Sequence, residues 1–162
     1  MIDIYRSDKE YILDDNYEVI SGISRSAHGE LYRVTDLAED TEHLAKQTIV
    51  HKNQLSVSVD DISNKLTNLK KNGYPAIVPI IDFEVKEEED DIVVWVVMDE
   101  SPSASLAQII QFHIDETDQI LNERQKGQDV QQISIALCEA IEHFHKIDIV
   151  HGNIKPQNIF EV

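Results

Sequence analysis

The first hundred residues alternate short apolar runs with turns and charged segments, a pattern typical of antiparallel strands. It predicts five strands, at Tyr17 to Ile20, Glu30 to Thr35, Leu44 to Val50, Val78 to Val85 and Ile92 to Met98. The acidic run 87–91 separates the last two. Such a run is typical of a solvated hairpin tip, so no function is assigned to it.

Between the third and fourth strands the apolar positions change to a helical period. Ile62, Leu66 and Leu69 recur at helical spacing after Asp60 and Asp61. Two carboxylates in the first turn favour a helix N-terminus. The turn residues of 72–75 end this helix.

Beyond Met98 the helical period dominates. A first helix is marked by Leu106, Ile109 and Ile110. A longer helix has one continuous apolar face, formed by Ile133, Ala136, Leu137, Ala140, Ile141 and Phe144. The segment Gln125 to Asp129 is the most loop-like stretch. A sheet with one helix therefore precedes a helical section.

Composition narrows the class of protein. The 162 residues, 41% of them hydrophobic, are enough for one domain with a real core. A net charge of -17 argues against a nucleic acid or an anionic membrane as partner, because the phosphates would be repelled. The charge is interpreted as an aid to solubility.

The single cysteine, Cys138, excludes an internal disulfide and fits a reducing compartment. Its apolar neighbours predict a buried, inert thiol. No signal-like N-terminus and no apolar run of membrane-spanning length occurs. The cytosol or the nucleus is the expected location.

The most specific motif is at the end of the chain. His151, Lys155, Pro156 and Asn158 have the spacing of His-Arg-Asp-Leu-Lys-Pro-Glu-Asn. The segment 149–159 therefore resembles the catalytic loop of a eukaryotic-type protein kinase. The resemblance places Asn153 where the family has its catalytic aspartate.

The resemblance implies an α+β fold. Residues 14–98 would be a kinase-like small lobe with a five-stranded antiparallel sheet and one helix, 99–105 the hinge, and 106–162 the start of the helical large lobe. The chain stops at Val162, before the expected magnesium-binding Asp-Phe-Gly. The fold is therefore expected to be an incomplete kinase domain, either a piece of a longer protein or one lacking most of the large lobe.

The positions of the family's nucleotide-binding residues can be located in this sequence from the intervals between them. Of the three glycines in the phosphate loop only Gly29 remains, and serines replace the others. Lys46 has the position of the lysine that contacts the ATP phosphates, and Met98 that of the gatekeeper. The resemblance implies ATP contacts at Ile23, Ser24, Ser26, Gly29, Leu31, Lys46, Met98, Asp99 and Ser101.

Several family residues are replaced. Lys65 stands where a glutamate should hold Lys46, and two cations at about 4 Å repel by roughly 1 to 4 kcal/mol. Asp61 is an alternative partner for Lys46, ranked below a simple absence of the pair. Leu44 is bulkier than the alanine that commonly covers the adenine. Gly152 replaces an arginine that senses a phosphorylated activation loop.

Part of the catalytic set remains. Asn158 is the expected Mg²⁺ ligand, and Lys155 is expected to face the transferring phosphate. Asn153 cannot accept a proton as a carboxylate does, and general-base help is worth about 10² to 10⁴ in rate.

Three functions follow from this set. The leading hypothesis is an inactive pseudokinase that binds or regulates a protein partner, with weak or no binding of ATP and Mg²⁺. The alternative is a serine/threonine protein kinase, or the N-terminal part of one, because Lys155 and Pro156 are typical of that class. The third is a truncated product without a selected role. An apolar face left uncovered on the long helix also predicts a partner or self-association.

Overall fold

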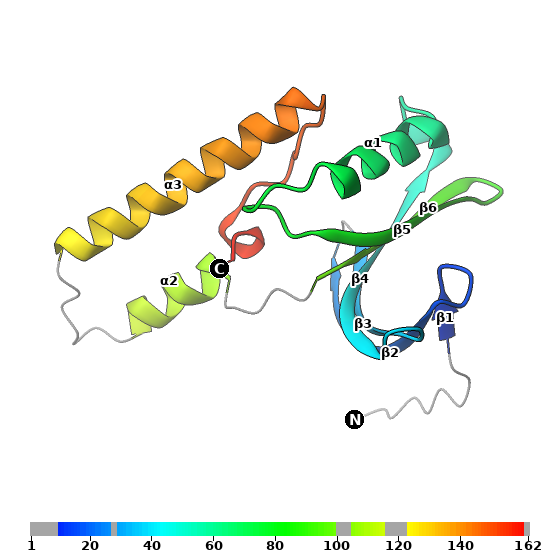
Figure 1. Ribbon diagram of the computed structural model, residues 1–162, viewed down its shortest axis with the longest axis horizontal. Helices are drawn as coiled ribbons and strands as arrows, with labels where there is room; N and C mark the ends of the chain where they lie inside the picture. The colour runs from blue at the N-terminus through cyan, green and yellow to red at the C-terminus, as the bar shows by residue number, and fades with distance from the viewer. Residues whose placement is uncertain (1–9, 27–28, 100–104, 116–122, 161–162) are drawn as a thin grey trace. The chain divides into compact units, whose positions relative to one another are not determined.

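The computed structural model describes residues 10–26, 29–99, 105–115 and 123–160. They form two compact units. The first contains the described residues within 1–73 and 79–100, and the second those within 74–78 and 101–162. Figure 1 shows a sheet with helix α1 (Val59–Lys71) in the first unit, and a short helix, α2 (Leu106–Asp115), with a long one, α3 (Glu123–Lys146), in the second.

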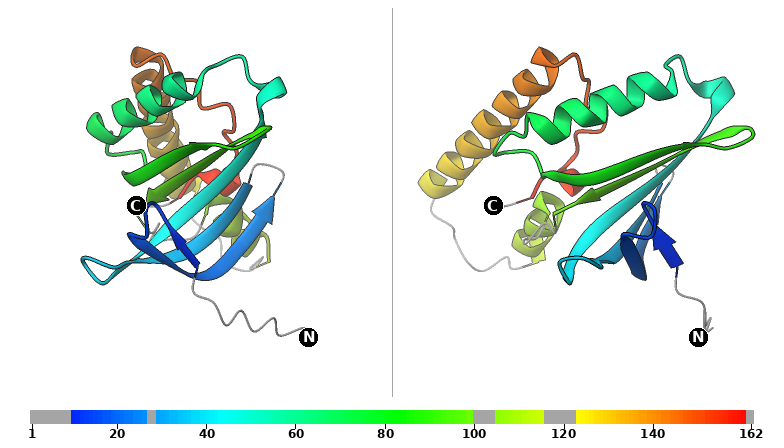
Figure 2. Two further views of the ribbon diagram at one scale, coloured as in Figure 1. Left: turned by 90° about the vertical axis from the view of Figure 1, so that its right-hand side faces the viewer. Right: turned by 45° about the vertical axis from the view of Figure 1, so that its right-hand side comes forward.

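The first unit is built on one antiparallel sheet of six strands, in the order β1-β2-β3-β4-β6-β5. The strands are β1 (Glu10–Ile12), β2 (Tyr17–Ser26), β3 (Gly29–Asp36), β4 (Thr41–His51), β5 (Ile80–Glu87) and β6 (Asp91–Met98). The two views in Figure 2 show its strong twist. The five predicted strands are confirmed. The sequence does not predict β1, because three residues are too few to show an alternating pattern.

The predicted strand bounds differ from the observed ones by one to three residues at β3, β4 and β6, where β4 begins at Thr41 and not at Leu44, and more informatively at β2 and β5. β2 continues to Ser26, with register shifts on either side of Ser21 to Gly22 that let the longer strand follow β3. β5 begins at Ile80 and not at Val78. Pro79 has no amide hydrogen for the ladder, so the strand begins after it.

One face of the sheet carries the core of the first unit. In the register Ala45 lies directly opposite Val97, and both are fully buried. The ring of Trp95 lies 5.4 Å from that of Tyr32. The buried residues of this core are Ile12, Leu13, Tyr17, Val34, Ala45, Val93, Trp95 and Val97. Ile12 and Leu13 belong to β1 and its turn, which therefore help to cover the apolar face.

Tyr17 makes this core sensitive to alkaline pH. Burial, then the charges of Asp82 and Asp36, raise the pKa of its phenol to about 12. A raised pKa gives stability that is fully present below the unfolded value near 10 and is lost as the pH rises toward 12. Urea unfolding from pH 8 to 12 should therefore show a smaller loss in Tyr17→Phe than in the parent chain. Tyr11→Phe, at an exposed site, should follow the parent curve; equal curves for all three would contradict the prediction.

Helix α1 (Val59–Lys71) forms where the period of its apolar residues predicts a helix, and it packs beside β5. Its N-terminus is closed by a capping box. The Ser58 hydroxyl accepts from the Asp61 amide at 3.1 Å, and the Asp61 carboxylate accepts from the Ser58 amide at 3.1 Å. Two of the helix's free amide groups are satisfied in this way.

The second unit contains α2 (Leu106–Asp115) and α3 (Glu123–Lys146). The prediction that Gln125 to Asp129 forms a loop is wrong, because α3 begins at Glu123. Most residues of that segment favour a helix, and the single Gly127 costs only about 1 kcal/mol. No helix in the described part of the chain is long and apolar enough to cross a membrane.

The side chains of α3 are only partly covered. Ala140, on the predicted apolar face, is buried. The prediction of a buried thiol is wrong, because Cys138 is exposed. One residue along a helix is a rotation of about 100°, which turns Cys138 away from the face of Leu137 and Ala140. Ile135, 50% exposed, lies on that other side as well.

Candidate functional site

The register of the sheet brings several predicted nucleotide contacts onto one face. Ser24 pairs with Leu31, Leu31 with Lys46, and Lys46 with Val96. Residues directly opposite in antiparallel strands point to the same side. Ser24, Leu31 and Lys46 therefore form one row, on the face opposite the buried Ala45.

A second row lies next to the first, nearer the end of β6. Leu44 pairs with Arg33 on one side and with Met98 on the other. Leu44 is two residues from Lys46, so it shares the face of Lys46. This row places Met98, the predicted gatekeeper, beside Leu44, the bulky residue at the position expected to cover an adenine.

Lys46 is half-buried between Leu31 and Val96. Among the residues that the structure describes, none forms an ion pair with it. A partly desolvated ammonium without a counter-ion attracts an anion. This feature makes Lys46 a candidate anion-binding group of the first unit.

The helix that should supply the counter-ion does not do so. Lys65 is exposed on α1. Asp61, the alternative, accepts from the Ser58 hydroxyl at 2.7 Å, and this bond is the main cause of its lowered pKa. Its carboxylate is thus engaged at the helix cap, which favours the absence of the pair over a substitute.

The remaining glycine of the phosphate loop has a local structural role. Gly29 has φ +119°, and a Cβ there would collide with the carbonyl oxygen of Gln47. The Ser26 hydroxyl donates to the Gly29 carbonyl at 3.2 Å. The backbones of β3 and β4 approach each other so closely here that only glycine fits. Glycine at this position is therefore required by the sheet itself, independently of any contact with a phosphate. The loop tip at 27–28 lies outside the described residues.

The start of the predicted hinge is tied to the sheet. The amide of Asp99 donates to the carbonyl of Pro79 at 3.3 Å, and its carboxylate lies 3.8 Å from the ring of His43. Ser101, the other predicted hinge contact, lies outside the described residues. Ile23 falls within the register shift of β2 and is exposed, so the register does not assign it to either row.

The catalytic-loop motif lies in the second unit and is held by its own backbone. The amide of Asn153 donates to the His151 ring at 3.2 Å, and the ring of Phe144 meets His151 edge-on at 5.6 Å. The side-chain amide of Asn158 donates to the Asn153 carbonyl at 2.8 Å. The loop continues into the short helix η2 (Pro156–Asn158). His151 and Asn158 thus fix the backbone around position 153.

The chemically active positions of this loop remain open. Among the described residues nothing hydrogen-bonds the Asn153 side chain, and Lys155 is exposed. The side-chain amide nitrogen of Asn158 holds the loop, while its side-chain oxygen has no hydrogen bond to a described residue. Gly152 has φ +70°, with no heavy atom within 4 Å of the place of a Cβ. The backbone conformation therefore favours glycine at position 152. The replacement of the family's arginine thus has a conformational consequence besides the loss of a positive charge.

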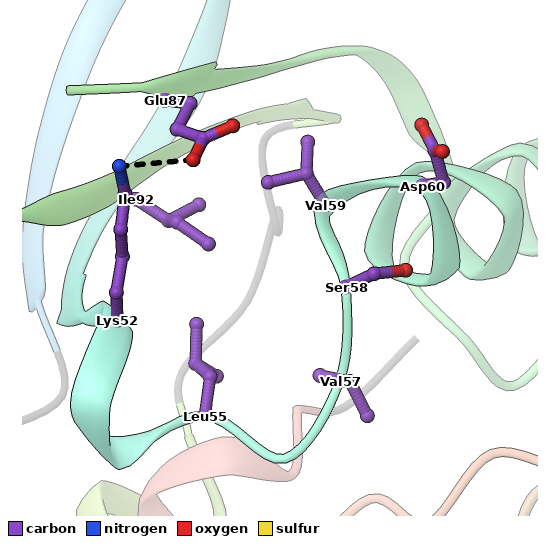
Figure 3. A pocket seen from close by; sticks show the side chains of 8 residues that line it. All are labelled: Lys52, Leu55, Val57, Ser58, Val59, Asp60, Glu87 and Ile92. Atoms are coloured by element: carbon purple, nitrogen blue, oxygen red, sulfur yellow. Dashed lines mark ion pairs between the residues drawn. The ribbon is translucent and has the colours of Figure 1, made fainter.

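The first unit also contains a pocket that the sequence does not predict (Figure 3). Its volume is about 440 Å³, and the side chains of Lys52 and Glu87 form an ion pair at 2.9 Å on one side of it. Its lining consists of Lys52, Leu55, Val57, Ser58, Val59, Asp60, Glu87 and Ile92. Alternating apolar residues between β4 and α1 are the only sequence signal, and they do not distinguish a pocket from a loop. None of the predicted site residues lines it.

Comparison with known proteins agrees with the motifs. The sequence profile of the family described as protein kinase domain matches residues 17–162. "Serine/threonine-protein kinase shk2" of Schizosaccharomyces pombe is 31% identical over 101 residues, which are 60% of this chain and 14% of that protein. "Probable serine/threonine-protein kinase CE0033" of Corynebacterium efficiens is 24% identical over 156 residues, 92% of this chain.

These relatives are much longer than the chain. It spans 14% of the length of the first and 21% of that of the second. The resemblance noted in the sequence is thereby confirmed, and so is the fold class. The roles of the individual residues stay predictions.

Proposed function

Because the chain belongs to the protein kinase family, we propose that it forms a catalytically inactive kinase-like module that acts by binding or regulating a protein partner. The observation that carries this proposal is Asn153 at the position of the catalytic aspartate, in a loop whose backbone is otherwise well held. A neutral amide cannot take the proton of a hydroxyl nucleophile, so general-base help is lost.

The nucleotide side of the proposal rests on Lys46. Its ammonium suits a phosphate, but no described carboxylate orients it, and Lys65 carries the wrong charge. Leu44 beside Met98 narrows the space expected for a base. In the second unit the Asn158 oxygen suits Mg²⁺, a cation that accepts few protein ligands and retains water. These residues support weak or absent binding of ATP and Mg²⁺.

The partner side rests on exposed apolar groups of the second unit. Val130 and Ile135 of α3 are 64% and 50% exposed, and Val150 in the approach to the catalytic loop is 80% exposed. Several exposed apolar side chains on one unit favour a protein contact or self-association. With a net charge of -17 a nucleic acid or an anionic membrane is disfavoured as the partner. The lone cysteine fits the cytosol or the nucleus.

The second candidate function is phosphoryl transfer to serine or threonine. It is favoured by the names of the two relatives and by Lys155 followed by Pro156. Its rate would depend on positioning and charge alone, because the proton acceptor is missing. A truncated product without a selected role remains the third candidate.

Nucleotide binding is tested by thermal unfolding with ATP, with and without Mg²⁺. A ligand at 100 times its dissociation constant stabilises the folded chain by about 2.7 kcal/mol. Because we propose weak or absent binding, micromolar ATP lies far below the dissociation constant, and we expect no shift of the unfolding temperature. Any shift at millimolar ATP should disappear in Lys46→Ala, whereas Lys65→Ala serves as the matched control on exposed α1. A full shift at micromolar ATP would contradict the proposal.

Activity is read in the same preparations with a serine/threonine peptide library. Magnesium-dependent phosphorylation that is lost in Lys46→Ala would sink the pseudokinase proposal and support the second candidate. Asn153→Asp should not restore turnover, because Lys46 still lacks its carboxylate. A large gain in that variant would mean that position 153 alone limits the chemistry.

A further inference from the structure

Strand β1 and the turn that follows it precede the region matched by the family, which begins at Tyr17. β1 lies at the edge of the sheet and pairs only with β2. The pairs are Glu10 with Val19, Tyr11 with Glu18, and Ile12 with Tyr17. The connection is the four-residue segment 13–16. Below it is called the hinge, and it is distinct from the predicted kinase hinge at 99–105. Edge strands this short are held by few backbone bonds and depend on their side chains.

The hinge is strained. Leu13, Asp14 and Asp15 have φ values of 54°, 52° and 64°, in the left-handed region, and none of them is glycine. The Asn16 amide closes the turn by donating to the Leu13 carbonyl at 3.1 Å. L-residues disfavour this region because Cβ crowds the backbone. Three such residues in succession make a tight turn that would relax if the hinge became extended.

The side chains of β1 and its turn pack into an apolar cluster of the sheet. Ile12 and Leu13 are 6% and 4% exposed and belong to the cluster that contains Trp95 and Val97. If β1 simply left, this cluster and one edge of β2 would face water, which is costly. A second copy of the same segment would replace every lost contact, because it presents the same side chains in the same register.

We propose that two copies of this chain exchange β1, so that residues 10–12 of each copy pair with β2 of the other. An exchange of this kind is inexpensive when the intramolecular contacts are regained between copies. A short hinge under strain promotes it. Here the exchange would convert 13–16 into extended strand and release the left-handed conformations in both copies.

The observed register determines what meets at the centre of the exchanged dimer. Continued through an extended hinge, it places Leu13 opposite the second copy's Asn16 and Asp14 opposite the second copy's Asp15. Four carboxylates then gather around the two-fold axis. Like charges directly opposite each other on neighbouring strands destabilise the pairing. The two aspartates therefore favour the monomer at low salt.

The aspartates of the unexchanged hinge are within electrostatic reach of a cation, Lys86. The pKa of Lys86 is raised, first by its hydrogen bond with Glu84 and further by the charges of Glu84, Asp14 and Asp15. Lys86 lies on β5, at the opposite edge of the twisted sheet. Its charge partly offsets the aspartates when the hinge is turned back on its own chain. Strain and charge thus oppose each other, and their balance sets the dimer fraction.

Exchange is tested by a disulfide between positions 11 and 18, which are directly opposed. In a Cys138→Ser background, Tyr11→Cys and Glu18→Cys are made separately, mixed at high concentration in mild urea, returned to buffer and oxidised. We expect a covalent dimer containing one chain of each kind, in about tenfold excess over the dimers that either variant forms alone.

The double variant shows that the pair can form a disulfide at all. If it closes within single chains while the mixture gives no mixed dimer above the single variants, the proposal is overturned. Ile135→Glu on α3 should leave the mixed dimer unchanged. Loss of the mixed dimer in that variant would assign the association to α3 and also overturn the exchange.

The balance of strain and charge is tested by three matched chains. Asp14→Asn with Asp15→Asn keeps the left-handed turn but removes the charges, so it should raise the association constant about tenfold at low salt. Asp14→Gly with Asp15→Gly removes the strain as well, so it should associate about tenfold more weakly than the asparagine pair. Sedimentation would measure both; equal association of all three chains would contradict the mechanism.

Discussion

Replacing Gly29 with alanine is expected to destabilise the first unit by about 3 to 5 kcal/mol. Two effects add at this position. The backbone has φ +119°, where an L-residue is strained, and a Cβ would collide with the carbonyl of Gln47 on β4. Relief requires β3 and β4 to separate beside Lys46, which breaks sheet bonds. The free energy of unfolding from urea denaturation measures the loss.

Gly22→Ala is the matched control, because Gly22 is also in the β2–β3 hairpin but has no heavy atom within 4 Å of the place of a Cβ. Its effect should stay within about 0.5 kcal/mol. Similar stabilities for the two variants would show that crowding at Gly29 is relieved without cost. Because the effect is on folding, it should appear without any nucleotide, which separates the structural role of this glycine from phosphate binding.

Trp95→Ala is expected to lower the free energy of unfolding by about 3 to 5 kcal/mol, since it removes the largest buried side chain of the core and leaves a cavity. Trp95 is 7% exposed, and its ring lies 5.4 Å from that of Tyr32. Its neighbours are held by the backbone pairing of the sheet, so they cannot collapse fully into the cavity. Chemical denaturation followed by circular dichroism is the measurement, because the variant has lost the chain's only tryptophan.

Ile49→Ala is the control for this prediction. Ile49 lies on β4, next to β6, but is 56% exposed, so its truncation should cost less than about 1 kcal/mol. A loss from Trp95→Ala as small as that of Ile49→Ala would mean that the apolar face is poorly packed. The covering by Ile12 and Leu13 would then be in doubt as well.

Much of the architecture follows from the pattern of apolar residues. Alternation predicts β2 to β6, and helical spacing predicts α1 and the C-terminal half of α3, because burial on one face imposes the period of each element. The start of α3 is not predicted, since the polar residues 123–129 have no apolar period. β1 is missed for the same reason, being too short to show one.

The candidate site divides in the same way. Spacing along the chain identifies Lys46, Asn153 and Asn158, because the family keeps those intervals. Spacing does not show that Asp61 is engaged by Ser58, nor that the Asn158 amide holds the Asn153 carbonyl. Such hydrogen bonds depend on side-chain direction and on which groups are brought near each other.

The sequence by itself determined the family, the succession of β2 to β6 and of the helices, and the loss of a carboxylate at Asn153, because these depend on residue identity and interval. Only the tertiary structure decided that Lys46 is without a counter-ion among the described residues, that Gly29 is fixed by Gln47, and that β1 closes the Trp95 core through a strained hinge. The physical reason is that these features are contacts between segments distant in the chain, whose geometry is set by the register and twist of the sheet.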